Sequence, residues 1–145
     1  MYKYSILIHV LAACVWTGGH LVLAFAVLPD ILRSKNIPAL MQFESRFEKI
    51  GIPSLILLVV TGFYQALSQL EMDKWFNFSD HISRHISFKL MLIVGIVILA
   101  LHARLKLIPQ GEKVDLKFLA SHIYLVTLLS VLLVVVGISF RMAIV

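Results

Sequence analysis

Apolar residues gather in four long runs that are separated by short polar stretches. The runs cover approximately residues 5–29, 50–70, 86–108 and 116–140. Each holds about 20 residues or more, the length that an α-helix needs to cross a hydrocarbon core of ~30 Å at 1.5 Å per residue. Strands of a membrane barrel would be shorter and would alternate apolar with polar positions. The pattern therefore predicts an all-α integral membrane four-helix bundle, with residues 1–145 as a single domain.

Composition narrows the class of protein further. The chain is 60% hydrophobic and 14% charged, and its mean hydropathy is +0.94. Soluble domains carry about 25% charged residues, so the composition excludes a soluble enzyme, a disordered segment and a nucleic-acid-binding module. The partner that fits this surface is the lipid bilayer, and we expect a multi-pass protein of the cell inner membrane.

The net charge of +5 has a topological explanation. The connections 30–49 and 104–117 each hold four Lys or Arg residues, whereas 71–85 holds two. Basic residues concentrate in cytoplasmic loops. This distribution predicts that the first and third connections face the cytoplasm and that both termini lie on the outer, periplasmic side.

The first connection carries helix-like periodicity of its own. The segment ALMQFESRFEKIG, residues 39–51, mixes apolar and charged positions in a way that suits a short helix lying on the inner membrane surface. Pro53 would then fall in the first turn of the second span, where its missing N–H costs little. Gly18, Gly19 and Gly62 would permit close helix contacts.

The second connection is rich in aromatic side chains. Trp75, Phe76 and Phe78 suit the outer headgroup level, where such rings anchor. The acidic residues all fall in the predicted connections, so the sequence predicts no paired-carboxylate acid–base site within the spans.

Polar residues with ligand chemistry are expected at two depths. The outer group comprises His9, His81, His85 and Lys89, and the inner group comprises His20, His102 and His122. His9 and His20 share one face of the first helix and lie about 16 Å apart along its axis. Imidazole and amine groups are costly in lipid, so we expect them to point into the bundle.

Two kinds of site fit such a set. Histidine is an axial ligand of heme and a common ligand of copper. Candidate metal ligands are therefore His9, His20, His85, His102 and His122. A simpler interpretation also exists: His81 and His122 could lie at an interface or hydrogen-bond a neighbouring helix, and Lys89 could extend to the outer headgroups.

Several segments resemble the membrane domain of CopD-type copper resistance proteins. These are HVLAACVWTGGHLVLAFAVLP, FESRFEKIGIPSLILLVVTGFYQAL and ISFKLMLIVGIVILALHARLK. The most distinctive elements are His9 with Trp16, Arg46 before the second span, and Lys89 with His102. The resemblance implies copper uptake or resistance, with copper as the bound ion.

The same skeleton is similar to HemJ, a protoporphyrinogen oxidase family. That similarity implies heme b held by His9 and Lys89. The Gly-Gly pair after Trp16 and the additional His20 resemble the CopD group, and a HemJ-type asparagine-glutamate-proline segment is missing.

Three hypotheses follow. The first is copper handling, aided by a copper chaperone or by formation of a homo-oligomer. The second is a heme-b redox protein, an oxidase or a transmembrane electron carrier with a redox partner, whose cofactors would be bound by His9 with Lys89 or His85 and by His20 with His102 or His122. The third is a structural subunit without a cofactor. The sequence leaves open whether the protein is an enzyme.

Overall fold

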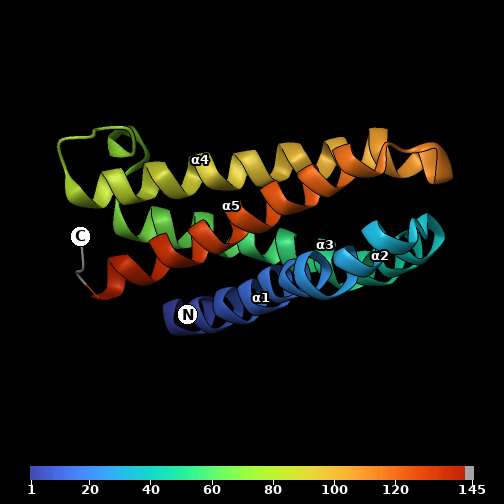
Figure 1. Cartoon of the computed structure of the whole chain (residues 1–145). Helices are drawn as coiled ribbons and strands as arrows, with labels where there is room; N and C mark the ends of the chain where they lie inside the picture. The colour runs from blue at the N-terminus through green and yellow to red at the C-terminus, as the bar shows by residue number, and fades with distance from the viewer. Residues whose placement is uncertain (143–145) are drawn as a thin grey trace.

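The computed structural model describes residues 1–142, with side chains through 139. Within this part of the chain the fold is all-α. Four helical segments have the length and apolar composition needed to cross a membrane: Tyr2–Ser34, Ile37–Gln69, His81–Lys113 and Leu116–Ser139. They run up and down alternately, so that the N-terminus, the connection at 70–80 and the end of α5 lie at one end of the bundle (Figure 1).

Two of these segments contain a widened turn. The first consists of α1 (Tyr2–Val22), the π-helical turn η1 (Leu23–Val27) and α2 (Leu28–Ser34). The third consists of α4 (His81–His102), the π-helical turn η3 (Ala103–Leu107) and the 3-10 turn η4 (Ile108–Lys113). The other two are α3 (Ile37–Gln69) and α5 (Leu116–Met142). A short 3-10 turn, η2 (Met72–Lys74), lies between α3 and α4.

Local residue chemistry sets the helix boundaries. Lys35 adopts a left-handed conformation with φ of 54° and ends α2. The side chain of Asn36 then caps α3 by accepting a hydrogen bond from the Ala39 N–H at 3.2 Å. Asp80 caps α4 in the same way through the Ser83 N–H. Such caps satisfy backbone donors that the first helical turn cannot pair.

The course of α3 differs from the structure that the sequence predicts for the first connection. Residues 39–51 do not form a separate surface helix, because α3 continues unbroken from Ile37 to Gln69. Pro53 consequently lies in the interior of α3 and not in a first turn. The charged residues of the lead-in are thereby brought onto the same helix as the apolar span.

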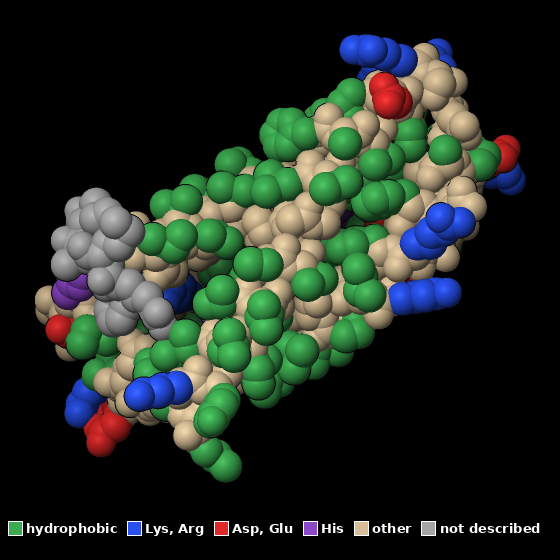
Figure 2. Space-filling view, turned by 90° about the horizontal axis from the view of Figure 1, so that it is seen from below, with side chains coloured by type: hydrophobic (Ala, Val, Ile, Leu, Met, Phe, Trp, Pro, Cys, Tyr) green, Lys and Arg blue, Asp and Glu red, His purple; other side chains and the backbone are tan. Residues whose placement is uncertain are grey.

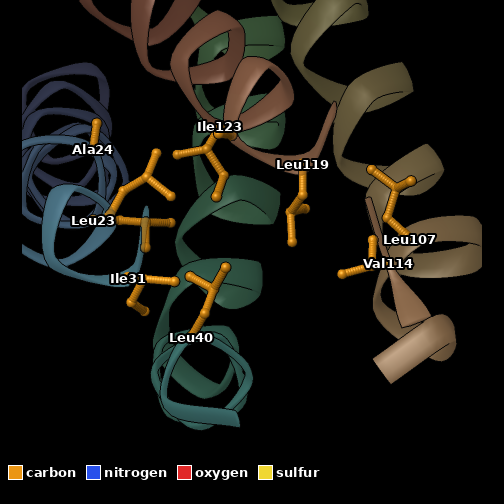
Figure 3. Close-up of a cluster of buried hydrophobic side chains, with 10 residues drawn as sticks. Leu23, Ala24, Ile31, Leu40, Leu107, Val114, Leu119 and Ile123 are labelled. Atoms are coloured by element: carbon orange, nitrogen blue, oxygen red, sulfur yellow. The ribbon is translucent and has the colours of Figure 1, made fainter. Parts of the chain in front are cut away.

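Packing is closest within two helix pairs, α1 with α3 and α4 with α5, and α1 also packs against α5. Direct contact between α3 and α4 is sparse. A core cluster at the end opposite the termini joins the helices there, and it includes Leu23, Leu28, Leu40, Leu119 and Ile123 (Figure 3). The bundle is thus well packed at this end and leaves room between α3 and α4.

The outer surface is dominated by exposed large apolar side chains. Phe25 of η1 and both Met91 and Ile98 of α4 are each more than half exposed. Lys and Arg side chains gather at the two ends, with an apolar surface between them (Figure 2). Since soluble monomers rarely expose contiguous apolar areas of this extent, this surface fits contact with lipid.

A buried tryptophan, Trp75, stabilises the connection at 70–80. Trp75 is buried within the protein, so its ring is not exposed for anchoring, and its indole N–H donates to the Leu70 carbonyl at 2.9 Å. Phe76 and Phe78 are exposed, as the anchoring interpretation requires. In the same connection, the hydrogen bond from Lys74 to Glu71 lowers the pKa of the Glu71 carboxyl and raises that of the Lys74 amine.

Candidate functional site: two cavities with histidine walls

Two cavities lie inside the bundle at different depths, and residues of all four long helices line each of them. The outer cavity, nearer the termini, has a volume of about 110 Å³. The inner cavity has a volume of about 90 Å³. One water needs roughly 10–15 Å³ by the same kind of measure, so each could hold several waters or a metal ion with its ligands.

His9 of α1 lines the outer cavity. Its Nδ1 lies 2.8 Å from the Thr61 hydroxyl oxygen. That hydroxyl donates its proton to the Leu57 carbonyl, so it accepts the Nδ1 proton of His9. Neutral imidazole carries only one N–H, and the Nε2 of His9 is therefore the nitrogen with a lone pair. This is how metal-binding histidines are typically oriented by a neighbouring group.

Lys89 of α4 lines the same cavity from the opposite helix pair. The side chain of Lys89 thus forms part of the cavity wall. Gly62 of α3 makes room for the imidazole, because a Cβ at this position would lie 3.2 Å from the His9 Cε1. The predicted close contact at this glycine is confirmed.

His20 of α1 lines the inner cavity. Its Nδ1 lies 2.9 Å from the carbonyl of Trp16, one turn earlier in the helix. A carbonyl can only accept, so Nδ1 carries the proton and Nε2 again has the lone pair. The ring packs against Trp16 at 4.4 Å between centroids and meets Phe47 edge-on at 5.4 Å.

His122 of α5 is buried and lines the inner cavity as well. Its Nε2 donates to the Leu99 carbonyl of α4 at 2.7 Å, which is the helix-to-helix hydrogen bond that the simpler interpretation expected. Nδ1 is consequently the nitrogen with a lone pair. His102 is exposed, but its ring lies only 5.3 Å from that of His122. His122 can thus brace the helix pair and still offer a ligand nitrogen.

Two acidic residues also line the inner cavity, and the sequence interpretation placed them elsewhere. Glu44 and Glu48 belong to α3, not to a connection. The prediction that every acidic residue lies in a connection is therefore wrong. Glu48 forms an ion pair with Arg104 of η3, which links α3 to the third helical segment. A signal was present: positions 44, 47, 48 and 51 share one face of a helix, provided that the helix continues through this segment.

A widened turn follows two of the inner histidines in the sequence, His20 and His102. The π-helical turn η1 follows His20 within three residues, and η3 directly follows His102. Such turns are rare and occur frequently at functional sites, because they shift the side chains that follow them around the helix. Here η3 carries Arg104 to the cavity.

An apolar layer separates the two cavities. Its buried members are Ala12, Trp16, Leu58, Ile96 and Val126. Trp16 is fixed within the layer by an indole N–H bond to the Ser130 hydroxyl at 3.0 Å. His9, Trp16 and His20 follow one face of α1, so the layer lies between the two imidazole levels.

The geometry does not form a multidentate metal centre. Among residues 1–142, no group of three or more His, Cys, Asp or Glu side chains is close enough to hold a metal ion. His85 does not line either cavity, and its ring lies against that of His81 at 4.7 Å between centroids. Among the described residues, the imidazoles therefore lie singly or as pairs of neighbouring rings.

Comparison with known proteins agrees with this architecture. A sequence profile of the family described as copper resistance protein D, CopD, matches residues 41–140. The matched region includes most of α3, all of α4 and nearly all of α5. No curated protein matches, and no solved structure matches. The likeness to HemJ stays a prediction. The profile match covers most of the chain, and the chain therefore belongs to the CopD family of copper resistance membrane proteins.

Proposed function

We propose that this protein passes copper across the cell inner membrane, using imidazoles at two depths as successive ligands. His9 would serve in the outer cavity, and His20 with His122 in the inner cavity, with His102 at its edge. Both termini would face the periplasm, so that copper entering from the outside meets His9 first. Family membership supports copper as the cargo, since copper resistance is what the CopD profile describes.

The observation that carries the proposal is the orientation of the α1 histidines. In His9 and in His20 the Nδ1 proton is donated to a protein acceptor, Thr61 or the Trp16 carbonyl. Each residue lines a cavity and has an Nε2 lone pair. Unprotonated imidazole nitrogen is a ligand that copper accepts readily.

Single and paired ligands suit transit better than storage. A site with three or four converged ligands holds its metal tightly, and release then becomes slow. One or two imidazoles at each level would bind copper more weakly and allow exchange between levels. The lack of a larger ligand group among residues 1–142 is consistent with this role.

Heme fits this conformation less well. Cavities that enclose molecules of drug size measure about 300–1,000 Å³, whereas the outer cavity between His9 and Lys89 measures about 110 Å³. A porphyrin would require α3 and α4 to separate. We therefore assign His9 and Lys89 no heme-dependent role.

The test is Cu(I) binding by the purified protein in detergent or nanodiscs. We expect the wild type to bind copper, and we expect His9→Ala and His20→Ala each to lose one site or at least tenfold in affinity. His81→Ala is the matched control, because His81 is an imidazole that lines neither cavity. Its copper binding should equal that of the wild type.

Two results would contradict the proposal. Equal copper stoichiometry and affinity in the wild type and both alanine variants would remove the histidine route. A Soret band in protein expressed with adequate heme would favour the heme hypothesis over copper transit.

A further inference from the structure

The charges that line the inner cavity do not cancel. Two carboxylates, Glu44 and Glu48, face one guanidinium, Arg104. Glu48 and Arg104 are joined in an ion pair, so these two charges compensate each other. Glu44, when ionised, therefore leaves the cavity with one negative charge in excess.

The outer cavity has the opposite character. Among the described residues that line it, Lys89 is basic and none is acidic. The inner cavity, with its carboxylates, therefore offers a cation a more favourable resting place than the outer one. The two levels of imidazole are chemically similar, so the charge around them must decide where a cation rests.

Position on the helix separates the two carboxylates. Glu44 lies seven residues after the start of α3, about 10 Å along the helix axis, and its half-buried side chain lines the cavity. Glu48, one turn farther in, is the carboxylate that has a basic partner.

We propose that Glu44 is the counter-charge of a monovalent cation site in the inner cavity, and that the Glu48–Arg104 pair keeps the site at a single negative charge. This inference rests on the proposed copper function and specifies its resting site and charge state. Cu(I) carries one positive charge, so one carboxylate neutralises it. Glu44 acts through space on a cation held by imidazole, which agrees with the absence of a three-ligand group among residues 1–142.

The ion pair gives the proposal a second, opposite prediction. Removing Arg104 would expose the charge of Glu48 to the cavity and raise its negative charge to two. Two carboxylates would hold a cation more tightly, and release would slow. Removing Glu44 would leave no excess charge, and the cation would bind more weakly.

The experiment measures Cu(I) affinity of the full chain in nanodiscs. For Glu44→Gln, which keeps the side-chain size, we expect affinity to fall about 10- to 100-fold. For Arg104→Gln we expect it to rise, about tenfold. Glu44→Asp should restore most of the affinity because it restores the charge. Glu112→Gln is the matched control, since Glu112 is exposed in η4 and lines neither cavity.

Thermal unfolding of each variant separates electrostatics from damage to the fold. An Arg104→Gln variant that is less stable yet binds copper more tightly would support the charge argument strongly. If Glu44→Gln binds copper like the wild type, or if both variants change affinity in the same direction, the inference is wrong. If the wild type itself binds no Cu(I), the copper function fails, and that result is distinct from a failure at Glu44 alone.

Discussion

Phe47 is a buried residue in the wall of the inner cavity. Its ring is buried between α1 and α3, edge-on to His20 and close to Gly19 and Gly51. A Cβ at Gly19 would overlap the Phe47 ring, whereas a Cβ at Gly18 would meet no atom within 4 Å. Adjacent glycines thus have different roles: one provides space for a cavity wall, and the other does not.

This difference predicts opposite effects of two neighbouring substitutions. Gly19→Ala should destabilise the protein by about 1–3 kcal/mol, because Phe47 must leave its place in a packed interior. Gly18→Ala should be neutral or stabilising by up to about 1 kcal/mol, since alanine is the better helix former. Thermal unfolding in detergent measures both. Similar losses in the two variants would show that Phe47 does not fix the helix spacing.

The sequence reveals ligand-bearing residues more readily than it reveals their orientation. Two imidazole levels on one face of α1 follow from helical periodicity alone, and the structure places His9 and His20 in separate cavities. The partners that select the tautomer, such as Thr61, belong to another helix. Periodicity within one helix contains no information about such contacts, so they could not be predicted.

At the scale of the element, the continuity of α3 is the feature that the sequence pattern did not predict. Hydrophobic runs locate the four spans well, but helices extend beyond their apolar centres. Charged residues at 44, 46, 48 and 49 suggest a connection, and Pro53 suggests a helix start. The structure instead shows one helix of 33 residues. Glu44 and Glu48 become cavity residues only because the backbone continues through them.

The connection at 70–80 is the least regular element that the structure describes between two spans, and buried serines of α4 fix it by donating to the carbonyls of Lys74 and Trp75. The Trp75 carbonyl accepts from the hydroxyls of Ser83 at 2.7 Å and of Ser87, both on α4. Both serines are fully buried. Buried hydroxyls of this kind fix an irregular segment against a helix by pairing backbone groups that regular structure leaves open.

Loss of both hydroxyls should loosen this connection. A Ser83→Ala, Ser87→Ala double variant leaves the Trp75 carbonyl buried without these donors, which costs about 1–3 kcal/mol. We expect faster proteolysis at 70–80 with the remaining helices intact. Ser68→Ala is the control, because Ser68 is exposed and donates to the Tyr64 carbonyl of its own helix. Equal proteolysis of the double variant and the wild type would contradict this account.

Across the whole molecule, charge is distributed unequally between the two ends of the bundle. The end that holds the connections at 35–36 and 114–115 is also reached by the widened turn η3 with Arg104 and Lys106. The other end, which holds the termini and the connection at 70–80, carries fewer basic residues in its connection. Basic residues resist transfer across the membrane, so the more basic end should remain in the cytoplasm.

The same orientation decides which cavity copper would meet first, and it is directly measurable. The native Cys14 is replaced with serine, and a single cysteine is introduced as Ser79→Cys in the outer connection or as Gln110→Cys in the inner one, both exposed positions. A membrane-impermeant thiol reagent added to intact spheroplasts should label Ser79→Cys at once, whereas Gln110→Cys should be labelled only after the membrane is permeabilised. The reverse labelling pattern would show that the bundle has the opposite orientation in the membrane. The Glu44 cavity would then be the first that copper meets from outside, and its excess negative charge would attract the cation at entry rather than hold it before release.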